Sequence, residues 1–255
     1  MEDFIILFVS FIIILGFINL YKTSTSKVKY VQSDLYNGRS NEYLVRYSDG
    51  TLPNKKNNSL AGANALAYMR ENLIILVEEV KKKHCGNDLK CEINSEEENE
   101  LKKQYISIKE IKMLINRFNP DNISESTPDN KYTSYSINKG EKIVFCIRDK
   151  KNNKIIDINT LMFVAIHELA HVMTISIGHG DDFWNNMRYL LSIAINTDTN
   201  KDYNTTSCFY KNNINNTSHT KIYHYNTYAE PEPYCGTNIT TTPCKDAMCS
   251  DPIKH

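Results

Sequence analysis

The spacing of apolar residues predicts two amphipathic helices in the first half of the chain. Over residues 60–83, apolar side chains recur every three or four positions, which is the spacing of a helix with one side facing a core. A shorter helix is predicted over 108–118, and it stops before Pro120 because proline cannot continue the helical hydrogen bonds. The core-facing positions of the first helix are Leu66, Met69, Leu73, Leu76, Val77 and Val80.

The second half of the chain predicts two strands and two further helices. Residues 133–137 and 142–148 have the pattern of strands, and the turn Asn138-Lys139-Gly140 separates them. The apolar stretch over 161–175 is typical of a buried helix or strand, of which we take the helix, and a second amphipathic helix follows, capped by Asp181 or Asp182. The apolar side of that helix carries Phe183, Trp184, Met187, Leu190, Leu191 and Ala194. Helices around a small sheet predict an α+β protein.

The buried helix carries the sequence His167-Glu168-Leu-Ala-His171. Two histidines four residues apart project from the same side of a helix, so both imidazoles can bind one zinc ion. Glu168 then lies beside the metal, where it can act as the general base for a water molecule. The alternative is that both histidines are core residues satisfied by hydrogen bonds, which is costly for so many polar groups on an apolar helix.

Catalytic zinc usually has three protein ligands, so a third is needed. His179 is the best candidate, because Gly178 can end the metal helix in a left-handed turn and return the chain toward the ion. Asp181 or Asp182 can take its place as the ligand, or His179 can be a loop residue. The first glutamate after Glu168 is Glu230, which lies beyond a long polar stretch and is a poor candidate.

The amino terminus predicts a membrane anchor. Residues 4–20 contain no charge, and a helix of this length spans roughly 26 Å, slightly less than the hydrocarbon core of a bilayer. A cleaved signal peptide and a buried helix are the alternatives. Lysines and arginines lie only after the segment, so the positive-inside rule predicts a catalytic domain on the cytoplasmic side or inside a virion.

Charge and cysteine content indicate which binding partners and which crosslinks to expect. The 30 Lys and Arg residues balance the 30 Asp and Glu residues. The chain therefore has no net positive charge of the kind that would predict nucleic-acid binding. Of the seven cysteines, Cys85 and Cys91 enclose a short loop, and Cys208, Cys235, Cys244 and Cys249 lie late in the chain. Disulfides are possible among them, whereas the spacing of the late cysteines is not that of a zinc ribbon.

The region over about 62–195 resembles the WLM and SprT-like zinc metallopeptidases. In that family a helical His-Glu-x-x-His precedes a third histidine and then an aromatic residue four positions later, as with His179 and Phe183 here. Residues 138–148 are similar to the family's Asn-x-Gly turn and the apolar edge strand that follows it. The step from His171 to His179 is eight residues, two longer than the family pattern. The resemblance implies a zincin fold, a Zn²⁺ cofactor and a protein or peptide substrate, and the Asn- and Lys-rich composition suits a viral member.

The predicted organisation is a transmembrane anchor at 1–22, a linker at 23–58, a metallopeptidase domain at 59–195 with an insertion at 85–105, and a polar extension at 196–255 that can cover the cleft. The expected function is peptide hydrolysis by a membrane-anchored zinc metallopeptidase. Tyr223, Tyr225 or Tyr228 could stabilise the transition state, and the sequence does not choose among them. The alternatives are a catalytically silent zincin fold, acting as a tethered interaction or virion structural protein, and a secreted protease.

Overall fold

The structure is a computed structural model of the chain. It describes residues 12, 28–37, 41–47, 55–86, 91, 95–127, 130, 132–199, 202–207, 209–214 and 221–244. The predicted membrane anchor at 4–20 lies outside these residues except for Ile12. Within the ranges given above, no helix is both long enough and apolar enough to cross a membrane.

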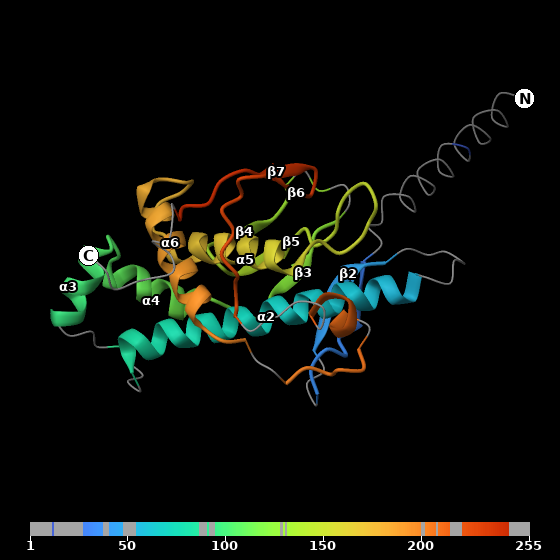
Figure 1. Cartoon of the computed structure of the whole chain (residues 1–255), viewed down its shortest axis with the longest axis horizontal. Coiled ribbons are helices and arrows are strands. Elements are labelled where there is room, and N and C mark those ends of the chain that lie inside the picture. The colour runs from blue at the N-terminus through green and yellow to red at the C-terminus, as the bar shows by residue number, and fades with distance from the viewer. Residues whose placement is uncertain are drawn as a thin grey trace, which may run out of the picture.

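Helices are combined with a small sheet, which α2 and α5 contact, and this confirms the predicted α+β class (Figure 1). The long helix α2 contacts three of the sheet strands and also α4, α5 and α6, so it holds the helical and sheet parts of the fold together. The helices are α2 (Lys55–Cys85), α3 (Ser95–Lys103), α4 (Ile108–Arg117), α5 (Ile158–Met173), α6 (Asp181–Asn196) and the π-helical turn η1 (Tyr210–Ile214).

The main sheet has five strands in the order β1-β2-β3-β5-β4. β1 (Val28–Gln32) pairs antiparallel with β2 (Glu42–Arg46), which lies parallel to β3 (Ile123–Glu125). β3 is parallel to β5 (Lys142–Phe145), and β5 pairs antiparallel with β4 (Tyr135–Ile137) through the predicted turn at 138–140. β4 is therefore an edge strand, and its free edge faces the site described below.

Helix α5 is the buried helix predicted from the apolar stretch. Asp157 begins it as the N-cap, because its side chain accepts a hydrogen bond from the Thr160 backbone N–H at 3.0 Å. The helix contacts α2, α4 and α6 and also β4, so almost every side of it is covered. Its buried positions include Leu161, Met162, Ala165, Ile166, Leu169, Ala170, Val172 and Met173.

The carboxyl-terminal part of the described chain forms a hairpin of β6 (Glu232–Tyr234) and β7 (Thr237–Ile239). Cys235 and Gly236 make its tight turn with φ angles of 49° and 86°. A disulfide joins Cys235 to Cys146, directly after β5, and so ties the hairpin to the main sheet. A second disulfide joins Cys85 and Cys91, the pair that encloses a short loop, and Cys244 is also disulfide-bonded.

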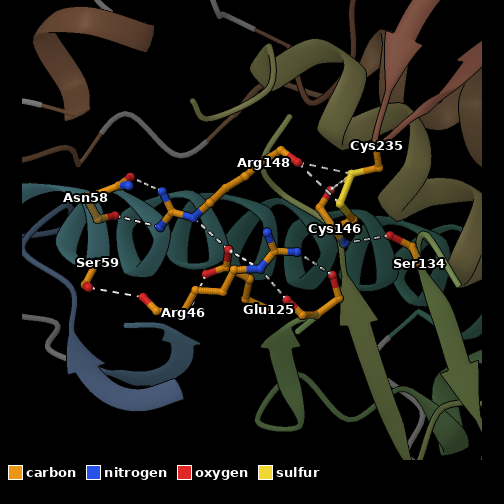
Figure 2. Close-up of polar contacts among 9 residues, drawn as sticks. Arg46, Asn58, Ser59, Glu125, Ser134, Cys146, Arg148 and Cys235 are labelled. Atoms are coloured by element: carbon orange, nitrogen blue, oxygen red, sulfur yellow. Dashed lines mark hydrogen bonds and ion pairs between the residues drawn. A yellow bond between two sulfur atoms is a disulfide. The ribbon is translucent and has the colours of Figure 1, made fainter. Parts of the chain in front are cut away.

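A buried ion pair links β2, β3, the segment after β5 and the start of α2 (Figure 2). Arg148 is only 1% exposed, and its Nε donates to Glu125 Oε1 at 2.7 Å. Its Nη2 donates to the Asn58 carbonyl at the start of α2, while the Arg46 backbone N–H on β2 donates to Glu125 Oε2 at 2.8 Å. Gly62 leaves room for the guanidinium, because a Cβ at this position would lie 2.4 Å from Arg148 Nη2.

Replacing Arg148 by methionine should destabilise the protein strongly, because Glu125 would stay buried with only Arg46 to balance its charge. Breaking a buried pair in this way costs about 3 kcal/mol or more. The matched control is Lys82→Ala, which removes an exposed ion pair with Glu79 and should cost less than about 1 kcal/mol. Denaturant unfolding measures both values, and equal losses would contradict a structural role for the buried pair.

Candidate metal centre

Three histidines meet at one point of the fold. His167 and His171 project from α5, and His179 approaches them from the loop between α5 and α6. One ring nitrogen from each lies within 4.8 Å of the others, and the His167 and His179 Nε2 atoms are 3.1 Å apart. The structure thus brings together the three predicted metal ligands. Asp181 and Asp182 are not part of this cluster and lie in the first turn of α6.

The helix that carries the first two histidines ends earlier than predicted. It ends at Met173 with Thr174 as the C-cap, so the expectation that Gly178 ends it is wrong. Thr174 Oγ1 donates to the Ala170 carbonyl at 2.7 Å and accepts from Asn186 Nδ2 at 3.0 Å, which fixes the helix end against α6. Gly178 does adopt a left-handed conformation, with φ of 92°, but in the loop directly before His179.

The loop of residues 174–180 absorbs the long step between the second and third histidines. Lys139, in the β4–β5 turn, donates through Nζ to the Thr174 carbonyl at 2.9 Å and also to the Ser176 carbonyl. The N-cap of α6 is Gly180, without a side-chain cap, so the predicted capping by Asp181 or Asp182 is wrong. A turn of the sheet therefore holds the loop that carries His179.

An aromatic residue of α6 packs against all three imidazoles. The Phe183 ring is fully buried, and its centroid lies 4.9, 4.4 and 4.6 Å from those of His167, His171 and His179. Packing against one rigid ring restricts the rotation of each imidazole. The aromatic position four residues after His179 thus serves to orient the histidines.

Burial keeps the two helical histidines neutral. Desolvation, and then the neighbouring histidines, lowers the pKa of His167 to about 3. Desolvation, and then His179 and Lys139, lowers the pKa of His171 to about 4. Neutral imidazole is the form that binds a metal ion, so these two side chains are ready to bind one at neutral pH.

Glu168 lies beside the histidines and is only 4% exposed. The backbone N–H of Ser136 on β4 donates to its carboxylate, whereas Oε2 has no hydrogen-bond partner within the described part of the chain. Burial raises the pKa of Glu168 to about 8. An unsatisfied carboxylate oxygen inside a protein is costly unless a ligand or water completes it. The donor set and this oxygen together fit a zinc ion and a water.

These groups lie in a cleft of about 810 Å³. It is lined by the edge strand β4, by α5, by the loop before α6, and by the β6–β7 hairpin with residues 240 and 241 after it. Part of the predicted polar extension therefore lines the cleft. The lining side chains include Ser134, Tyr135, Lys139, Phe163, Ile177, Tyr234, Asn238 and Thr241.

Of the described residues, the tyrosines that line this cleft are Tyr135 and Tyr234, and neither was among those that the sequence suggested. Tyr223 and Tyr228 are buried against Phe163, and Tyr225 donates to the Cys244 carbonyl at 3.2 Å. Tyr234 lines the cleft beside Glu168 instead. Its one sequence signal is the adjacent Cys235, and that signal becomes informative only once Cys146 is known to be the partner.

The raised pKa of Glu168 makes the stability of the metal-free protein depend on pH. The folded state keeps a proton on Glu168 that the unfolded state loses above pH 4.5, so the free energy of unfolding of the wild type, relative to that of Glu168→Gln, should fall as pH rises from about 4.5 to about 8. The lowered pKa values of His167 and His171 act in the opposite direction and are common to both proteins. The relative loss should be on the order of a few kcal/mol, because the glutamine cannot titrate. Denaturant unfolding at several pH values in the presence of a chelator checks this. Parallel curves for both proteins would contradict it.

Comparison with known proteins places the chain among viral relatives. It is 30% identical to the uncharacterized protein R325 of Acanthamoeba polyphaga mimivirus over 217 residues, which is 85% of each chain. Over 63 residues, 24% of this chain, it is 49% identical to protein 042R of Invertebrate iridescent virus 3 and 41% identical to protein 136R of Invertebrate iridescent virus 6. These stretches cover 38% and 35% of the two iridescent virus proteins, which are also uncharacterized. No solved structure matches significantly.

The family comparison covers the metal centre. The model of the WLM domain matches residues 90–236, a range that includes α4, α5, α6, the three histidines and Tyr234. The match continues past residue 195 to the turn of the β6–β7 hairpin. The chain therefore belongs to the WLM-domain family, which is associated with zincin-like metallopeptidases.

Proposed function

We propose that the protein hydrolyses peptide bonds as a zinc-dependent metallopeptidase. The observation that carries this proposal is the unsatisfied Oε2 of Glu168, buried beside three convergent histidines in an open cleft. A purely structural metal site needs no such carboxylate. A base that is neutral until about pH 8 in the metal-free protein would ionise more readily next to a cation.

His167, His171 and His179 would hold the zinc ion. When bound there, zinc supplies a Lewis acid that polarises a carbonyl group and makes water more acidic. Glu168 takes a proton from the attacking water through Oε2 and delivers it to the leaving amine, while the Ser136 N–H fixes the carboxylate in place.

The edge strand β4 is suited to binding an extended peptide. It pairs with β5 on one side only, and residues 133–136 line the cleft on the other. A peptide that adds to this edge would form backbone hydrogen bonds whatever its sequence, and its side chains would then contact the cleft walls. Ile177, which is 95% exposed at the rim, offers an apolar contact to such a substrate.

We further propose that residues 4–20 anchor the protein in a membrane, with the catalytic domain on the cytoplasmic side or inside a virion. Of these two locations, the disulfides favour the virion, because disulfides are rare in the reducing cytosol. The relatives named above are viral proteins, which agrees with a viral origin of this chain.

Replacing Glu168 by glutamine should abolish activity and leave metal binding intact. Loss of the general base should lower the rate by about 10² to 10⁴-fold, measured with fluorescent casein as an unfolded substrate. Zinc content should stay at that of the wild type. Glu141→Gln, at an exposed carboxylate on the β4–β5 turn, is the control and should remain active. A wild-type protein that binds zinc but cleaves no substrate would support the catalytically silent alternative.

Replacing His179 by alanine should weaken zinc binding by more than about 100-fold, because one of three ligands is lost. Asp182→Asn tests the alternative third ligand and should bind zinc as the wild type does, since Asp182 lies outside the histidine cluster. Competition with a chromogenic chelator measures both affinities. The reverse ranking of the two variants would show that His179 is not the third ligand.

A further inference from the structure

Tyr234 combines burial with a position in the cleft. It is the last residue of β6, it is only 4% exposed, and it lines the cleft together with Glu168 and the histidines. Burial raises the pKa of Tyr234 above its ordinary range, although the hydrogen bond with Ser134 lowers it in part. The phenol therefore keeps its proton at any pH at which a peptidase works, and it can act only through hydrogen bonding.

A chain of hydrogen bonds sets the direction of that phenol. The Cys146 backbone N–H donates to Ser134 Oγ at 3.0 Å, and Ser134 Oγ lies 2.5 Å from Tyr234 Oη. Because Ser134 already accepts from Cys146, its own proton can be donated to Tyr234 Oη, which leaves the phenolic proton free to point into the cleft. Each bond in such a chain polarises the next and makes the last donor stronger.

Covalent geometry fixes both ends of this chain. Cys146 follows β5 and is bonded to Cys235, the residue next to Tyr234, so the donor of the first hydrogen bond and the backbone of the phenol share one crosslink (Figure 2). Arg148, two residues after Cys146, is fixed in the buried ion pair with Glu125. The phenol is thus held at both its backbone and its oxygen.

We propose that Tyr234 is a further catalytic residue of the peptidase, whose phenolic O–H donates to the scissile carbonyl oxygen as that oxygen becomes negatively charged, and that Ser134 positions it. This rests on the proposed function. A rigid donor aimed at developing charge stabilises the transition state more than the bound substrate, so its loss should lower kcat rather than raise KM. Tyr135 is the rival phenol, since it also lines the cleft and its oxygen accepts from Asn130 at 3.1 Å.

The first test compares three phenylalanine variants on a quenched fluorescent peptide containing a site that the wild type cleaves in casein. Tyr234→Phe should lower kcat by about 10² to 10³-fold, with KM, zinc content and melting temperature close to those of the wild type. Tyr225→Phe removes a hydroxyl from the same carboxyl-terminal segment but outside the cleft lining, and should keep wild-type kcat. Wild-type kcat in Tyr234→Phe, or the larger kcat loss in Tyr135→Phe, would overturn the assignment.

The second test separates positioning from folding by a double-mutant cycle. Ser134→Ala should lower kcat in the wild-type background, because the phenol loses its direction, and should have little further effect in Tyr234→Phe. Equal effects in the two backgrounds would show that Ser134 acts independently of Tyr234. If the proposed function is wrong, the wild-type protein will be as inactive as Glu168→Gln. If the wild type is active and Tyr234→Phe is equally active, only the role of Tyr234 is rejected.

Discussion

A helix that is buried on almost every side carries the polar groups of the site, and the rest of the structure is arranged to provide partners for them. Two imidazoles and a carboxyl on α5 would be costly in an apolar core if nothing completed their hydrogen bonds or bound between them. Each neighbouring element contributes one partner for these groups. β4 donates a backbone N–H to Glu168, α6 places Phe183 against the imidazoles, and the loop between α5 and α6 brings His179.

Buried polar groups away from the site are also paired with one another. Glu125 and Arg148 are both buried, and together with Asn58 they join β3, the end of β5 and the start of α2. Asn186 on α6 connects Glu110 on α4 to Thr174 at the end of α5. These links restrict changes in the angle between α5 and its neighbours. Such rigidity is required when the ligands of one site come from two segments of the chain.

The features that could be predicted from the sequence are local. The helical spacing over 60–83, the turn at 138–140 and the placement of His167, Glu168 and His171 on one helix all follow from residues that are close in the chain. The end of α5 could not be predicted. The helix ends at its C-cap Thr174, which is bonded to Asn186 and Lys139 from distant parts of the chain, and not at Gly178. Tyr234 could not be chosen either, since its place depends on the disulfide between the next residue, Cys235, and Cys146, which are 89 residues apart.

That disulfide also makes the metal-binding region a covalent ring. The segment between Cys146 and Cys235 includes α5, α6, all three histidines and Tyr234. Closing so long a loop restricts the unfolded chain and stabilises the fold by roughly 4 to 5 kcal/mol in the chain-entropy description. A single cut anywhere within this ring opens it without releasing a fragment, so ligands, base and phenol would remain on one molecule. A cut in the polar stretch after α6 would therefore leave the histidines, Glu168 and Tyr234 covalently joined.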